Sequence, residues 1–154
     1  MKGLIDIYLP DFKYSDNNIA EKYSRIKNYK EISLKCILEM IDQQPHNIIN
    51  DGIMQQGVIV RHLILPNNIK NTNDCISIIH SLSPNIIFSL MTQYNPMYKA
   101  SVFSELNRPI NIDEYNDVMN YLSNFDFSEI FYQPFEANAK DNFNPDFTKS
   151  NPFS

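Results

Sequence analysis

The chain has 154 residues, a net charge of −5 and a pI of about 5.1, and 43% of its residues are hydrophobic. This composition is typical of a single domain with a core of its own, and the scattered lysines and arginines form no basic stripe for a nucleic acid backbone. No stretch approaches the roughly 20 apolar residues that span a bilayer, so we expect a cytoplasmic protein with neither a membrane nor a nucleic acid partner.

The first strand is expected at 4–9, a short apolar run that ends before Pro10. Because this run begins almost at the first residue, we expect the chain to be cut from a longer protein. Ser15 is expected to cap a short helix that ends near Lys27, and Asn28 to cap a second helix. The helical spacing gives the second helix an inward face of Leu34, Ile37, Leu38 and Ile41.

The central strand is expected at 57–66 (GVIVRHLILP), an apolar run broken only by Arg61 and His62. Such a run is typical of a strand covered on both faces in a parallel sheet. Burying an unpaired guanidinium costs several kcal/mol, so Arg61 needs an anionic partner, either a protein carboxylate or a bound anionic ligand. Alternation places His62 on the opposite face, where we expect it to pack between the sheet and a helix.

A hairpin is expected around Asp51 and Gly52, just before the central strand. After the strand, Thr72 is expected to cap a helix that carries His80, for which the sequence offers no partner. A third strand is expected at 85–91.

The last helix begins with a capping-box pattern, Asn111 followed by Glu114, and a short strand is expected at 130–132. The domain is therefore placed at 1–136, and an irregular tail rich in Asn, Asp, Pro and Phe at 137–154.

Strands separated by helices predict right-handed crossovers and a parallel sheet, which is α/β architecture. Ligands of such sheets bind beyond the carboxyl ends of the strands. The loops there carry Asp11 and Lys13 after the first strand, and Gln93 and Tyr94 after the third. Arg61 joins them only if its long side chain reaches that edge. This polar set suits a small zwitterionic or amino-acid-like ligand.

The sequence contains no Gly-rich phosphate loop and no Gly-x-Ser-x-Gly elbow, and the spacing of its three histidines indicates no catalytic triad. No catalytic residue and no metal ligand is therefore assigned. Cys36 and Cys75 are far apart, and we expect both to be small core residues.

Four segments together resemble the C-terminal half of the radical SAM proteins related to pyruvate formate-lyase activating enzyme. They are 3–14 (GLIDIYLPDFKY), 60–66 (VRHLILP), 104–108 (SELNR) and 112–115 (IDEY), and the similarity extends to 151–153 (NPF). The resemblance implies a partial TIM-like barrel, of which this chain would supply the last three or four of six βα units.

The resemblance also implies a function. Family members bind a [4Fe–4S] cluster and S-adenosylmethionine, and commonly generate a glycyl radical in a partner protein. Lys13, in the segment that begins at Asp11, and Arg61 match positions that hold S-adenosylmethionine, and Gln93 and Tyr94 stand where activating enzymes place a histidine. The family's cluster needs three closely spaced cysteines, whereas this sequence has two in all, so the chain alone is expected to be inactive.

Three hypotheses stay open. The chain is a fragment or split piece that needs an N-terminal companion chain with the cluster motif, or a non-catalytic module that binds a nucleoside or a protein. The third is an unrelated small α/β domain. For half a barrel, the open edge of the first strand predicts association or poor expression of the isolated chain.

Overall fold

In a computed structural model, residues 3–83 and 85–135 are described, so the tail placed at 137–154 lies outside the described residues. Four strands run parallel in the order β1-β3-β4-β5. Their bounds are β1 Ile7–Tyr8, β3 Ile53–Leu63, β4 Ile87–Met91 and β5 Glu129–Tyr132. The predicted α/β class with a parallel sheet is thus confirmed. The hairpin is also present, because β2 (Ile48–Asn50) pairs antiparallel with β3.

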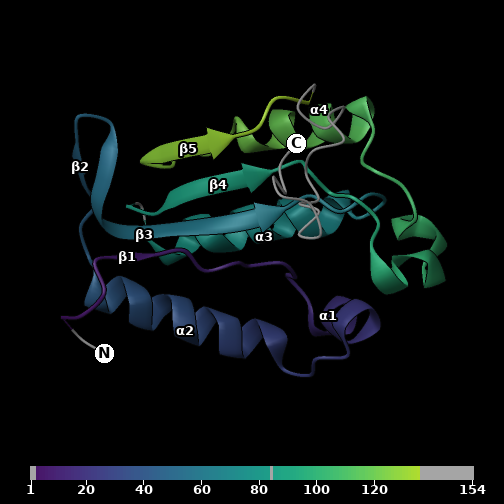
Figure 1. Cartoon of the computed structure of the whole chain (residues 1–154), viewed down its shortest axis with the longest axis horizontal. Coiled ribbons are helices and arrows are strands. Elements are labelled where there is room, and N and C mark those ends of the chain that lie inside the picture. Colours follow the sequence, from purple (N-terminus) through teal and green to yellow (C-terminus); the bar gives the residue numbers. More distant parts are fainter. Residues whose placement is uncertain (1–2, 84, 136–154) are drawn as a thin grey trace, which may run out of the picture.

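Three of the four α-helices pack against one side of the sheet, and the first α-helix packs in a second cluster with Leu65 instead. Their bounds are α1 Asn17–Ser24, α2 Tyr29–Gln43, α3 Ile69–Leu82 and α4 Ile112–Leu122, and two short 3-10 helices, η1 Tyr98–Val102 and η2 Ser104–Leu106, precede α4. In Figure 1, α3 and α4 lie behind the strands and α2 runs beside β1. Within the described ranges, no helix is long and apolar enough to cross a membrane.

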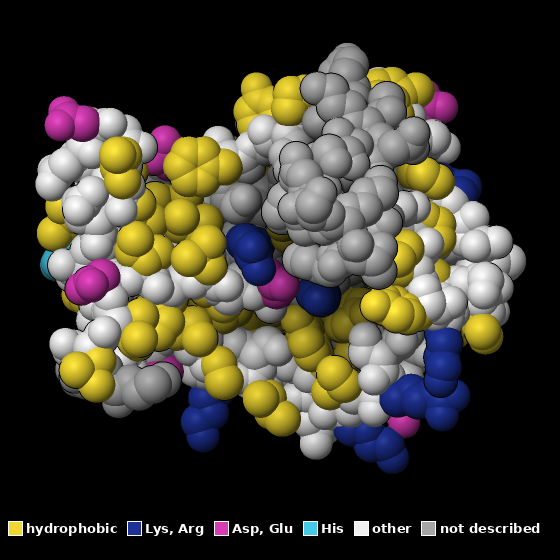
Figure 2. All heavy atoms as spheres, in the orientation of Figure 1, with side chains coloured by type: hydrophobic (Ala, Val, Ile, Leu, Met, Phe, Trp, Pro, Cys, Tyr) yellow, Lys and Arg dark blue, Asp and Glu magenta, His cyan; other side chains and the backbone are white. Residues whose placement is uncertain are grey.

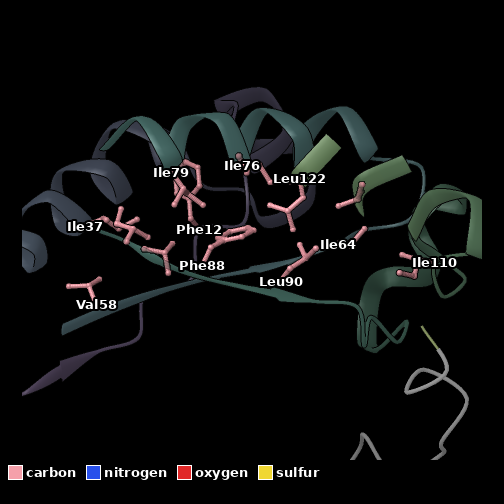
Figure 3. Close-up of a cluster of buried hydrophobic side chains, with 14 residues drawn as sticks. Phe12, Ile37, Val58, Ile64, Ile76, Ile79, Phe88, Leu90, Ile110 and Leu122 are labelled. Atoms are coloured by element: carbon pink, nitrogen blue, oxygen red, sulfur yellow. The ribbon is translucent and has the colours of Figure 1, made fainter. Parts of the chain in front are cut away.

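The hydrophobic core lies between the sheet and this helical layer (Figure 3). It is built from alternate strand residues, such as Val58 and Val60 of β3 and Phe88 and Leu90 of β4, against the inner faces of the helices. Each of these side chains is almost fully buried, which is worth about 1.5–3 kcal/mol for a large apolar group. Period-two alternation in the strands therefore determines which face carries the helices.

Within the described ranges, helices cover β3 on one face only, and the residues of its other face are partly exposed, so the expectation of a strand buried on both faces is wrong. Val58, Val60 and His62 are buried, whereas Arg61 and Leu63 on the other face are partly exposed. The continuous apolar run resembles a doubly covered strand because the outer face also carries apolar side chains. Figure 2 shows this outer face, on which hydrophobic side chains gather over the strands with a few charged groups among them.

Two helix starts differ from the expected ones. Asp16, not Ser15, caps α1 through its side chain, which accepts hydrogen bonds from the backbone N–H groups of Asn18 and Ile19. Helix α3 begins at Ile69, so Thr72 lies inside it and is buried. The hydroxyl of Thr72 contacts His62 and does not cap the helix.

The other two helix starts were placed correctly, although only one has the expected cap. Asn28 precedes α2 but makes no side-chain cap hydrogen bond. The capping box of Asn111 and Glu114 at the start of α4 is present with both of its hydrogen bonds.

Three expected side-chain environments are also wrong. Leu38, placed on the inner face of α2, is 48% exposed, and Cys36 is exposed although Cys75 is buried as expected. His80 has a partner after all, because its Nε2 lies 2.8 Å from Oδ1 of Asp126. Asp126 follows α4, so sequence spacing gave no sign that it would meet His80 on α3.

Candidate functional site

The sheet face opposite the described helices holds a row of side chains from four neighbouring segments. Asp11 bridges to Arg61 of β3, Arg61 pairs in register with Ser89 of β4, and Ser89 pairs with Phe131 of β5. Residues paired in register point to the same face of a sheet, so these four lie side by side. Asp11 lies just beyond β1, at the carboxyl-terminal half of the sheet.

Main-chain hydrogen bonds hold Asp11 beside Arg61. The N–H of Arg61 donates to the carbonyl of Pro10, and the N–H of Phe12 donates to the carbonyl of Arg61, each at 2.9 Å. These bonds continue the β1–β3 ladder past the end of β1. The position of the carboxylate is thus determined by backbone pairing and does not depend on the flexible arginine side chain.

Asp11 joins two cations. Nε of Arg61 donates to Oδ1 of Asp11 at 2.7 Å, and Nζ of Lys13 lies 3.9 Å from Oδ2. The three side chains are between 32% and 51% exposed, so the pairs contribute at most about 1 kcal/mol each to stability. The prediction that Arg61 needs an anionic partner is confirmed, and this partner is a carboxylate of the protein itself.

Arg61 keeps binding capacity after this pairing. Only its Nε is used, and within residues 3–83 and 85–135 no group accepts a hydrogen bond from Nη1 or Nη2. A guanidinium presents its donors as a planar fork that matches a carboxylate or phosphate in two parallel hydrogen bonds. The cluster therefore offers an anion-binding fork next to a carboxylate that can accept from an amine.

The other two expected binding residues do not join this cluster. The hydroxyl of Tyr94 donates to the carbonyl of Leu106 at 2.9 Å, and its ring packs in a small cluster with Tyr14 and Leu65. Burial raises the pKa of the Tyr94 hydroxyl above its usual value. Tyr94 thus serves to hold the η1–η2 segment against the strand ends.

Gln93 is also engaged, because its Oε1 accepts a hydrogen bond from Nε2 of Gln133. Gln133 in turn accepts from the backbone N–H of Thr92 at 3.2 Å. The pair ties the end of β4 to the end of β5. Gln93 thus lies at the correct edge of the sheet but is held by the neighbouring strand.

His62 lies behind Arg61, on the helix side of the same strand, as predicted. It is fully buried, with Nδ1 2.7 Å from the carbonyl oxygen of Phe12 and Nε2 3.0 Å from Oγ1 of Thr72. Burial lowers the pKa of His62 to about 4, partly offset by the bond to Phe12. His62 is therefore neutral at pH 7 and ties the segment after β1 to β3 and α3.

The cysteines do not fit an iron–sulfur cluster. Cys75 is buried in the core, where burial raises the pKa of its thiol, and Cys36 is exposed on α2. Neither lies in the row around Arg61, and no group of three potential metal ligands occurs among the described residues. The cluster of the resembling family needs three closely spaced cysteines, and this chain has two in all.

Sequence reasoning missed Ser89 and Phe131, which lie beside Arg61. Ser89 could have been found, because it is a polar residue at an alternate position of a strand expected to pair with the central one. Phe131 depends on the register between β4 and β5, which no local pattern specifies.

The chain is similar to an uncharacterized protein of Methanocaldococcus jannaschii, with 30% identity over 132 residues. The match covers 85% of this chain but 35% of the archaeal protein, so the chain spans about a third of that relative's length. No family model and no solved structure matches the chain.

Proposed function

We propose that this chain is the C-terminal part of a radical SAM-type partial barrel, related to pyruvate formate-lyase activating enzyme, that holds the amino acid end of S-adenosylmethionine. Two features support this. Parallel strands joined by helices on one face are the arrangement of a βα barrel wall, whose inner face carries no helices. The chain also spans only about a third of its archaeal relative, as expected for part of a longer protein.

The observation that carries the proposal is the open fork of Arg61 beside Asp11, on the inner face of that wall. The α-carboxylate of S-adenosylmethionine would accept from Nη1 and Nη2 of Arg61, and its α-ammonium would donate to Asp11. Lys13, whose Nζ lies 3.9 Å from the Asp11 carboxylate, adds a second cation to the proposed site. Tyr94 and Gln93, the two residues expected near the nucleoside end, are held by other contacts.

The chain does not supply the cluster on which radical chemistry depends, as its two cysteines are separated and one is buried. We therefore propose that activity requires an N-terminal companion chain with the cluster motif. The substrate of such a pair would be a glycyl-radical protein. By itself the chain is a binding half without catalytic residues.

Isothermal titration calorimetry with S-adenosylmethionine tests the proposed site. Removal of the guanidinium in Arg61→Ala should weaken binding about 10- to 100-fold, the equivalent of one charge-assisted interaction of roughly 1.5–3 kcal/mol. Arg61→Lys keeps the charge but loses the fork, so its affinity for S-adenosylmethionine should lie between those of the wild type and Arg61→Ala. Lys27→Ala removes an exposed cation that pairs with Glu21 and not with the Asp11 cluster, so this variant should bind normally. No binding heat, or equal affinity in Arg61→Ala, would contradict the proposal.

The shortage of cysteines favours a second candidate, a non-catalytic module that binds a nucleoside or a protein. The same titration distinguishes the two. Free methionine should compete with S-adenosylmethionine if the amino acid end is held, whereas competition by adenosine alone would favour the nucleoside module.

A further inference from the structure

Among residues 3–83 and 85–135, nothing pairs with some main-chain groups on the outer edge of β1. β1 bonds to β3 through alternate residues, since Gly57 N–H donates to the Asp6 carbonyl and Arg61 N–H donates to the Pro10 carbonyl. In a parallel ladder the intervening residues, Ile7 and Leu9, direct their N–H and C=O groups to the other side. No strand in the described part of the chain pairs with that side.

This open edge has defined limits. Before it, Nε2 of Gln44 donates to the carbonyl of Ile5, and after it the hydroxyl of Tyr29 lies 3.4 Å from the carbonyl of Asp11. Both capping side chains come from the two ends of the α2 segment. Side chains thus satisfy the main chain at both ends of the edge and leave the main-chain groups of Ile7 and Leu9 between them. This stretch is long enough to pair with a short strand.

A groove adjoins the same edge on the helical side. Its volume is about 340 Å³, and it is lined by Tyr8 of β1 and by Lys35, Cys36, Glu39, Met40 and Gln43 of α2. Its wall is fixed in place, because Tyr8 Oη donates to Oε1 of Gln43 at 2.7 Å. Its surface is mostly apolar, while Lys35 and Glu39 add one charge of each sign.

Edge and groove together define the shape of what binds them. Unpaired main-chain donors and acceptors are satisfied by an extended strand, and an apolar groove along a helix accepts the apolar face of a second helix. A strand followed by a helix would continue both layers of this fold, with the strand beside β1 and the helix against α2. A second copy of the chain would present its own β1 in the opposite direction about a two-fold axis.

We propose that the β1 edge and the α2 groove dock a strand–helix unit of a second polypeptide, one that corresponds to the part of the longer archaeal relative with no counterpart in this chain. The length comparison supports this occupant, since about two thirds of that relative lies outside the match. The inference rests on the proposed function only in taking the second polypeptide as the companion chain.

Co-expression of this chain with the unmatched portion of the archaeal relative tests the docking. We expect a one-to-one complex in size-exclusion chromatography with light scattering. Cys36 reports on the groove, because it is exposed while Cys75 is buried. Alkylation of Cys36 should slow at least about tenfold in the complex, as expected if only a minor undocked population reacts.

Two variants at one position isolate the edge. Leu9→Pro removes the N–H that faces outward and leaves the ladder to β3 intact, so the complex should be lost. Leu9→Ala shortens the same side chain but keeps the N–H and should retain the complex. Equal thermal melts of the two variants show that Leu9→Pro still folds.

Other results would overturn the docking proposal. These are a failure to form the complex, a complex in which Cys36 reacts at its free rate, or one that survives Leu9→Pro. A dimer of this chain alone that protects Cys36 would make the occupant a second copy. Complex formation is measured without S-adenosylmethionine, so an intact complex that binds no S-adenosylmethionine contradicts the proposed function alone.

Discussion

At the scale of single residues, His62 makes stability depend on pH. Its pKa of about 4 in the folded protein lies below the ordinary value of 6.5, because the imidazole is buried. Between pH 6.5 and 4 the unfolded chain therefore binds a proton that the folded chain does not. As the pH is lowered from 6.5 to 4, the free energy of unfolding should decrease by up to about 3 kcal/mol. Above pH 6.5 this contribution is fully present.

Urea denaturation at a series of pH values measures this effect. In the variant His62→Gln the loss between pH 6.5 and 4 should shrink to the smaller part that carboxylates such as Glu114 contribute near pH 4, whatever the variant's stability at pH 7. An NMR titration of the wild-type imidazole should give a midpoint near pH 4. A midpoint near 6.5 would show that His62 is not buried as described.

Glu114 is a second residue with a large expected effect. It is 9% exposed and accepts from both terminal nitrogens of Arg108 at 2.8 Å, which holds its pKa down to about 2. It also accepts from the backbone N–H groups of Asn67 and Asn111. Glu114→Gln should lower the free energy of unfolding by about 1–3 kcal/mol in urea denaturation. The exposed neighbour Asp113 provides the control, since Asp113→Asn should cost much less. Equal losses would contradict this role.

At the scale of elements, Gly57 permits β2 and β1 to meet on β3. It pairs with Ile7 at a φ of +132°, and an added Cβ would overlap Oδ1 of Asn47 and lie 2.6 Å from Cε of Met54. Gly57→Ala should therefore cost more than about 2 kcal/mol of unfolding free energy.

Gly52, in the hairpin turn, is the matched control for Gly57. Its φ is also positive, at +75°, but nothing lies within 4 Å of an added Cβ. Gly52→Ala should cost only about 1 kcal/mol from backbone strain. If the two alanine variants are equally stable in urea, the close packing at Gly57 is wrong.

Local patterns predicted the elements better than their contacts. Apolar runs and the capping box at Asn111 identified strands and helices that are present, because these signals depend on near neighbours in sequence. Thr72 was misplaced because its hydroxyl contacts His62 instead of a helix end. Cys36 and Leu38 were expected in the core but are exposed. In α2 the buried face is centred on Ile37, and periodicity alone does not show how far a buried face extends around a helix.

The candidate site was predicted in part for a related reason. Asp11, Lys13 and Arg61 meet because parallel pairing aligns the end of β1 with β3, and the sequence predicted a parallel sheet but not which strands are neighbours. Tyr94 was lost to the site because the chain after β4 turns it toward the carbonyl of Leu106, a tertiary contact that helix and strand periodicity does not predict.

At the scale of the whole molecule, the helices within residues 3–83 and 85–135 leave one face of the sheet without a helical layer. Hydrophobic side chains gather on the visible part of that face, and no described strand pairs with the outer edge of β1, so we expect the isolated chain to self-associate or require a partner. Light scattering of the purified chain over a range of concentrations checks this. A single monomeric species at all concentrations would count against the proposal that this chain is one part of a barrel.

Saturation-transfer NMR of S-adenosylmethionine with this chain tests the central claim most directly, because it reports which part of the ligand touches the protein. The Arg61 fork and Asp11 should hold the methionyl end, so the methionyl protons should receive the strongest saturation and the adenosyl protons the weakest. This pattern should vanish in Arg61→Ala. Saturation confined to the adenosyl protons, or none in the wild-type protein, would show that the open fork of Arg61 is not a binding site for this ligand.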